Sequence, residues 1–146
     1  MILFFSLLFI VPVVDQLIKF FIISTVPEKK LVNTFLPFLK ITHTKNYGAA
    51  LGIFYNKRAL LIFVTLSILV YLIYLMVSKK IKNKFILGSI SLIIGGGIGN
   101  LIDRILKGYV TDYILLSFFP PVCNFADYCI TFGVILLLVC VIKQRH

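Results

Sequence analysis

The chain has 146 residues, of which 60% are hydrophobic, and it contains no tryptophan. Fifteen Lys and Arg residues against five Asp and Glu residues give a formal net charge of +10. This composition excludes a disordered chain and an ordinary water-soluble domain, and it indicates a single membrane domain over residues 1–146. Because the basic residues fall mainly between apolar runs, the charge indicates loops at an anionic membrane surface and no nucleic-acid partner.

Four apolar segments reach the length of about 20 residues that a membrane-spanning helix needs. We predict spans at residues 2–26, 59–77, 85–106 and 124–142. The first segment lacks a basic start and a small-residue cleavage site, so we expect a retained span in place of a cleaved signal peptide. The third contains the run GGGIGN at residues 95–100, which favours close helix packing over a phosphate-binding loop, because no strand precedes it.

The density of lysines predicts the orientation of the chain. Between the second and third spans, four lysines lie within residues 79–84: Lys79, Lys80, Lys82 and Lys84. The connector of residues 27–58 also carries basic residues but spreads them along its length. Because closely spaced basic residues favour the cytoplasmic side, we expect both termini inside.

The connectors on the opposite side have two different patterns. Residues 38–45 are partly alternating and β-branched, and the turn-forming Asn46-Tyr47-Gly48 follows them, which predicts a small sheet between the first and second spans. Residues 107–123 are too few to span a membrane and too apolar to stay in water. We expect them to lie in the membrane interface.

Charged residues of the spans gather toward one membrane face. The end of the first span, the end of the third and the start of the fourth must face the same side, because the spans alternate in direction. The charged residues at these places are Asp15, Lys19, Asp103, Arg104, Asp112 and Asp127. A charge at the bilayer centre costs about 2.5–3.5 kcal/mol. Each of these residues therefore needs a partner, a wet cavity or a chemical role.

Asp112 and Asp127 are the candidate catalytic pair. A folded-back connector can bring the end of the third span beside the start of the fourth. Two carboxyls that share one proton can divide the work of an aspartic protease, in which one acid activates water and the other protonates the amide. The alternative is that both are solvated, with Asp127 capping a helix start. The residues alone leave both interpretations open.

Other charged residues fit a supporting role. Asn100, Asp103 and Arg104 share one helical face, and Asp103 fits a buried ion pair between helices better than it fits catalysis. Asp15 and Lys19 have the i, i+4 spacing of a second such pair. The three cysteines are odd in number and form no CxxC motif, so neither a zinc site nor a disulfide framework is indicated.

Two other classes of function use the same carboxylates. In a metal-dependent membrane phosphotransferase or phosphatase, Asp103, Asp112 and Asp127 would hold Mg²⁺ against a lipid phosphate. In a proton-coupled transporter, carboxylates would form a relay across the membrane. The gathering of the charges at one face disfavours the transporter.

The sequence resembles the signal peptidase II family, the bacterial membrane aspartic proteases also called lipoprotein signal peptidases. The resemblance covers nearly the whole chain, in five ordered blocks: DQLIK at residues 15–19, NYGAALG at 46–52, GGGIGNLIDR at 95–104, GYVTDY at 108–113 and CNFAD at 123–127. The chain departs from the usual family pattern at Leu51, Tyr113, Cys123 and Tyr128. These departures concern the shape of the pocket, and none removes a carboxylate.

The resemblance implies a multi-pass protein of the bacterial cytoplasmic membrane that cuts diacylglyceryl-modified prolipoproteins before the lipidated cysteine. It implies that Asp112 and Asp127 are catalytic and that Asp15 and Lys19 support them. It further implies a substrate cleft lined by Asn46, Asn100, Arg104 and Asn124. The cleft would face outward and the termini inward, with no metal or organic cofactor. The expected partners are the lipidated precursors and membrane lipids, and we expect a monomer.

Overall fold

In the computed structural model, the described residues are 2–49, 53–78, 81 and 83–143. Within them lie the helices α1 (Ile2–Thr25), α2 (Arg58–Ser78), α3 (Lys84–Leu106) and α4 (Phe125–Lys143). All four are long and apolar enough to cross a membrane, which confirms the predicted four-span fold. Leu51, Lys79, Lys80 and Lys82, which the sequence singled out, lie outside the described residues.

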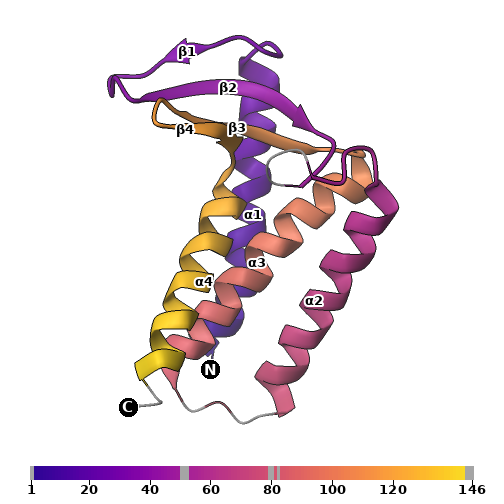
Figure 1. Ribbon diagram of the computed structural model, residues 1–146, viewed down its shortest axis with the longest axis vertical. Helices are drawn as coiled ribbons and strands as arrows, with labels where there is room; N and C mark the ends of the chain where they lie inside the picture. Colours follow the sequence, from indigo (N-terminus) through magenta and orange to yellow (C-terminus); the bar gives the residue numbers. More distant parts are fainter. Residues whose placement is uncertain (1, 50–52, 79–80, 82, 144–146) are drawn as a thin grey trace.

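Helix α3 lies at the centre of the bundle. It packs against α1, α2 and α4, and in Figure 1 it lies between α4 on the left and α2 on the right. At Gly96, an added Cβ would lie 2.6 Å from the carbonyl oxygen of Ala126 in α4. The missing side chain therefore lets the two backbones approach closely. This approach brings the second half of α3 beside the first turn of α4.

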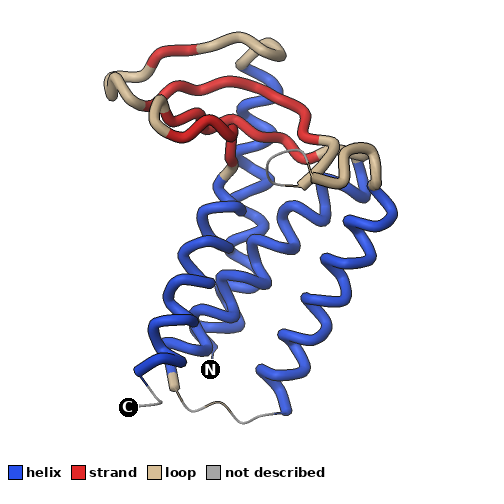
Figure 2. Tube along the Cα trace, in the orientation of Figure 1, coloured by secondary structure: helices blue, strands red, loops and turns tan. Residues whose placement is uncertain are grey.

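A four-stranded antiparallel sheet covers one end of the bundle (Figures 1 and 2). Its strands, in the order β1-β2-β3-β4, are β1 (Val32–Asn33), β2 (Leu39–Asn46), β3 (Val110–Leu116) and β4 (Phe119–Cys123). The predicted sheet between α1 and α2 therefore gains two strands from the connector between α3 and α4. The sequence predicts only an interfacial segment for residues 107–123, because β3 is buried by its partners and lacks the polar alternation that indicates a strand.

Buried contacts fix the sheet to the helices. Ile22 and Val26 at the end of α1 pack with Tyr113 of β3 in one apolar cluster. The Tyr113 hydroxyl accepts a hydrogen bond from the Phe125 backbone N–H at the start of α4, at 3.1 Å. The sheet is therefore attached to α1 and to α4 by the strand that also carries Asp112.

Candidate active site

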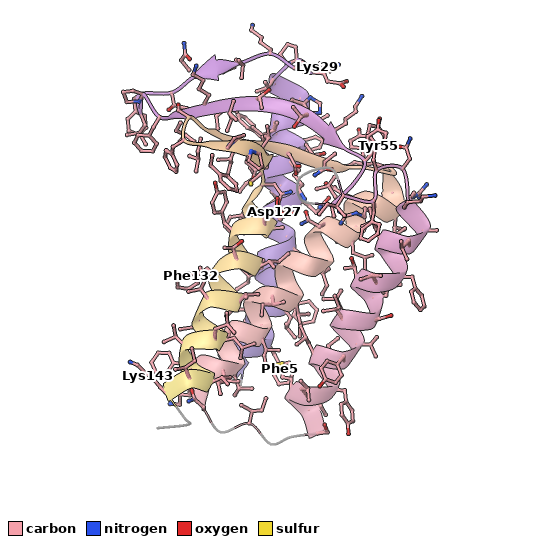
Figure 3. All side chains as sticks on the ribbon, viewed as in Figure 1. Phe5, Lys29, Tyr55, Asp127, Phe132 and Lys143 are labelled. Atoms are coloured by element: carbon pink, nitrogen blue, oxygen red, sulfur yellow. The ribbon has the colours of Figure 1, made fainter. Side chains whose placement is uncertain are left out.

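A cavity of about 840 Å³ lies between the sheet and the helices. Asp112 of β3 and Asp127 of α4 both line it, together with Asn46, Asn100 and Arg104. The whole of strand β4 contributes a largely apolar wall. Figure 3 labels Asp127 directly below the sheet, far from Lys143 at the other end of α4. The structure thus brings five of the predicted site residues to one cavity at the sheet end of the bundle.

Asp112 is held by two amide side chains. Its Oδ2 accepts a hydrogen bond from Asn46 Nδ2 at 2.8 Å, and its Oδ1 accepts one from Asn124 Nδ2 at 2.7 Å. The residue is only 3% exposed. Burial, reinforced by the charge of Asp127, raises the pKa of Asp112 to about 7, although the two amide hydrogen bonds act against the rise. This carboxyl can therefore hold a proton near neutral pH.

A β-bulge aligns Asp112 with its neighbours. In the pairing of β2 with β3, Ile41 lies opposite Ile114 and Thr44 opposite Asp112, with a shift of register between them. Two residues of β2 thus oppose the single Tyr113, as in a bulge, which re-aims the side chains that follow it. The Thr44 hydroxyl then donates to the Asp112 carbonyl oxygen at 3.1 Å.

Asp127 lies in the first turn of α4 and forms a reciprocal cap with Asn124. Asp127 N–H donates to Asn124 Oδ1 at 2.9 Å, and Asn124 N–H donates to Asp127 Oδ2 at 3.1 Å. This is a capping box, in which two side chains satisfy two free backbone donors. The capping contact predicted for Asp127 is therefore observed at the cavity, whereas Asp112 is buried and not solvated as that alternative requires.

Two buried asparagines join the two acids. Asn100 Nδ2 donates to Asp127 Oδ1 at 2.8 Å, and Asn124 Nδ2 donates to Asn100 Oδ1 at 3.2 Å as well as to Asp112. Asn124 is fully buried behind the carboxyls and is not among the described residues that line the cavity. Its contacts are those of a residue that positions Asp112 and Asp127.

A fully buried charge cluster lies behind the asparagines. Lys19 of α1 contacts Asp15 Oδ2 at 2.7 Å, Asp103 Oδ2 at 3.2 Å and Asn100 Oδ1 at 2.9 Å. Asp103 also accepts hydrogen bonds from Lys107 Nζ at 2.8 Å and from the Thr111 backbone N–H at 2.9 Å. These contacts join α1, α3 and β3, and they bring the predicted supporting residues Asp15, Lys19 and Asp103 into one cluster.

Arg104 extends from α3 toward the loop after β2. Its Nη2 donates to the Gly48 carbonyl oxygen at 2.9 Å, and the guanidinium lines the cavity. Arg58 at the start of α2 holds the same end of α3, since its Nε donates to the Arg104 carbonyl oxygen at 2.8 Å and its Nη2 to that of Ile105 at 2.9 Å. No pattern in the sequence indicates this role of Arg58, because its partners are backbone atoms distant along the chain.

The described residues do not form the three-carboxylate metal site of the phosphotransferase alternative. In the described part of the chain, no group of three His, Cys, Asp or Glu side chains comes together. Asp103, which the phosphotransferase alternative requires as a ligand, forms ion pairs with Lys19 and Lys107.

Cys123 lines the cavity, and burial raises the pKa of its thiol to about 11. It is therefore protonated at neutral pH and is a poor nucleophile.

Comparison with known proteins identifies the family of the chain. The family model described as signal peptidase (SPase) II matches residues 7–143. The chain belongs to the signal peptidase II family. Lipoprotein signal peptidases of Staphylococcus aureus strains JH9 and Newman are each 38% identical over 137 residues, which cover 92% of this chain and 84% of theirs.

Two solved structures are similar to the whole fold. A bacterial membrane enzyme solved by the in meso method at 2.3 Å resolution superposes with a TM-score of 0.92 at 34% identity, over 97% of this chain and 88% of that one. A second, at 1.9 Å resolution, has a TM-score of 0.87 at 34% identity, over 96% of this chain and 92% of that one. These structures confirm the predicted four-helix membrane fold, and the family model together with the Staphylococcus aureus relatives confirms the predicted signal peptidase II family.

Proposed function

We propose that this signal peptidase II family member removes the signal peptide from diacylglyceryl-modified prolipoproteins, cutting before the lipidated cysteine, with Asp112 and Asp127 as its catalytic pair. The observation that carries the proposal is that both carboxyls line one cavity and that Asn124 donates to both, from its side-chain amide to Asp112 and from its backbone N–H to Asp127. The family match and the names of the Staphylococcus aureus relatives support the choice of substrate.

The two acids have different surroundings, which suggests different roles. Asp112, with its pKa raised to about 7, can hold a proton near neutral pH. Asp127 lies at the N-terminal end of α4, where the helix dipole favours a negative charge, and it accepts two hydrogen bonds. We assign Asp127 as the carboxylate that activates water and Asp112 as the acid.

The reaction then needs only these two groups and one water. Asp127 removes a proton from the water as its oxygen attacks the scissile carbonyl carbon, and Asp112 donates its proton to the carbonyl oxygen. When the intermediate collapses, Asp112 recovers that proton, the C–N bond breaks, and Asp127 gives its proton to the leaving nitrogen. Both acids return to their starting states, so no cofactor is consumed.

The other polar residues position the acids and the substrate. Asn46, Asn100 and Asn124 hold the carboxyl oxygens in place, and the buried cluster around Lys19 supports Asn100. Arg104 lines the cavity and remains the proposed contact for the peptide backbone of the substrate. We propose that a single chain is the working unit.

The location of the site suits a substrate that stays in the membrane. Each buried CH₂ of a lipid chain stabilises the membrane-bound state by about 0.8 kcal/mol, so a diacylated cysteine stays at the bilayer. We propose that the sheet end of the bundle lies at the outer face of the bacterial cytoplasmic membrane. Both termini would then be cytoplasmic, as the lysine density between α2 and α3 predicts.

A mobility-shift assay with the purified full chain in lipid vesicles tests the proposed substrate. A diacylated precursor and the same precursor without the lipid are incubated separately, and the release of the signal peptide is followed on a gel. We expect cleavage of the diacylated precursor alone. Equal cleavage of both precursors, or of neither, would contradict the proposed specificity.

The same assay separates the protease from the metal-dependent phosphotransferase. Preincubation with a chelator of divalent cations should leave the cleavage rate unchanged, because the proposed steps use only carboxyls and water. A loss of cleavage that added Mg²⁺ restores would favour a metal-dependent reaction at the same acids.

A further inference from the structure

Two turns of the sheet meet at its free end, although they come from different connectors. The turn of residues 34–38 joins β1 to β2, and the turn of residues 117–118 joins β3 to β4. Ser117 N–H donates to the Phe38 carbonyl oxygen at 2.9 Å, and the rings of Phe38 and Phe118 lie 6.3 Å apart. We call these two turns, together with Phe119, the aromatic tip.

The aromatic tip exposes an unusual amount of apolar surface. Phe35 is 91% exposed and Phe118 is 74% exposed, while Phe38 and Phe119 are each 46% exposed. Water-soluble surfaces rarely gather large apolar side chains in one place, and a contiguous group of them marks an interaction site. Because the rings come from two converging turns, the tip is a built surface and not a single stray side chain.

The position of the aromatic tip determines what can contact it. In Figure 1 both turns lie at the left end of the sheet, beyond the upper end of α4 and away from α2. Strand β4 runs from the tip to the first turn of α4, where the fourth candidate membrane span begins. The tip therefore overhangs the area beside the bundle, which the surrounding bilayer occupies once the four helices span it.

The charges near the aromatic tip fit a lipid surface. None of the five acidic residues of the chain lies in residues 31–40 or 114–122, and Lys40 is the only charged residue in these two segments. Phenylalanine rings and a lysine are compatible with the acyl boundary and the phosphates of a leaflet. A carboxylate at this place would be repelled by anionic lipid, and the chain has none there.

We propose that the aromatic tip inserts into the interface of the leaflet next to the sheet, so that phospholipid, and not protein, covers it. The sheet is then held at two places, by α1 and α4 at one end and by the leaflet at the other. Strand β3, which carries Asp112, lies between these attachments and stays at the depth of the membrane surface. The inference rests on the membrane-spanning fold and is independent of the proposed cleavage reaction.

Tryptophan fluorescence tests the insertion directly, because the chain contains no tryptophan of its own. Phe35→Trp and Phe118→Trp each place one reporter at the aromatic tip and keep an aromatic ring there. The full chain is reconstituted in phospholipid vesicles at about one molecule per vesicle, with lipids brominated either near the carbonyl groups or near the chain ends. We expect a blue-shifted emission that shallow bromines quench more strongly than deep ones.

Two matched variants calibrate the depth. Lys30→Trp replaces an exposed residue outside the aromatic tip and should show red-shifted emission without quenching. Phe132→Trp replaces a 61% exposed ring on α4, which Figure 3 shows pointing away from the bundle, and should be quenched most by deep bromines. Emission at both tip positions that matches Lys30→Trp would overturn the proposal. So would a blue shift without lipid quenching, which would indicate a protein partner, or quenching at only one of the two positions.

Discussion

Lys19 donates a hydrogen bond to Asn100, with 2.9 Å between Nζ and Oδ1. Both residues are buried, and the lysine can only donate. The contact therefore fixes the orientation of the Asn100 amide, so that its Nδ2 faces Asp127 Oδ1 at 2.8 Å. A charge on α1 thus determines which group α3 presents to the proposed catalytic carboxyl on α4.

Replacing Lys19 should destabilise the fold. Lys19→Met leaves the Asp15 carboxylate without its cation and removes one of the two cations on Asp103. Breaking a buried pair in this way costs about 3–5 kcal/mol. Thermal unfolding of the purified protein in detergent measures the loss. Lys107→Met is the matched control, because Lys107 also contacts Asp103 but is 26% exposed, and it should cost clearly less. Equal losses would contradict the central place of Lys19.

Removing the Asn100 amide should slow cleavage without unfolding the protein. Asn100→Ala deletes the hydrogen bond to Asp127, and a bond to a charged group is worth about 1.5–3 kcal/mol, or roughly 10–100-fold in rate. The loss should appear in kcat with the diacylated precursor. Ser91→Ala is the control on the same helix, because its hydroxyl contacts only the Leu87 carbonyl oxygen in the described structure. A similar loss in both variants would indicate a general effect on α3.

The rate of cleavage should fall as the pH rises through about 7. The pKa of Asp112 is raised to about 7, so the group is protonated below that pH and ionised above it. Because the proposed step needs the protonated form, kcat/KM decreases on the alkaline side. A pH profile of the initial rate on the diacylated precursor measures this. A rate that stays constant between about pH 6 and pH 9 would remove Asp112 from the role of acid.

Two adjacent glycines should respond differently to substitution. In Gly96→Ala the new Cβ would meet the Ala126 carbonyl oxygen at 2.6 Å, so the backbones of α3 and α4 must separate. In Gly97→Ala it would meet only the end of the Leu69 side chain at 2.8 Å, which can rotate away. We expect Gly96→Ala to cost about 1–3 kcal/mol and to lower kcat, and Gly97→Ala to change little. The melting temperature and the kcat of each variant test this difference.

The sequence predicts the spans well because their signal is local. A run of apolar residues of sufficient length needs no knowledge of partners, and all four helices lie close to the predicted ranges. The sorting of charges to one end likewise follows from the alternation of spans. Strand β3 escaped prediction because its first four residues are buried by β2 and α1, and that burial depends on contacts far apart in the chain.

The sequence predicts which residues belong to the candidate site, but it does not predict which atoms contact one another there. Asp112 and Asp127 stood out as costly charges near apolar sequence, and the residues predicted to support them are found in one buried cluster. The contacts of Asn124 with Asp112, Asn100 and Asp127 could not be predicted from the sequence, because they depend on the simultaneous approach of β3, α3 and α4. The hydrogen bonds from Arg58 to two carbonyl oxygens of α3 also could not be predicted, because they join residues far apart in the chain.

The most direct test of the catalytic pair compares cleavage of a diacylated precursor by the wild-type chain, Asp112→Asn and Asp127→Asn. Each variant is purified from membranes, and its accumulation and melting temperature are measured alongside, so that a folding defect is recognised. Neither variant should cleave the precursor while both still insert and accumulate. Substantial cleavage by both variants would contradict the assignment of Asp112 and Asp127 as the acids that share the catalytic proton.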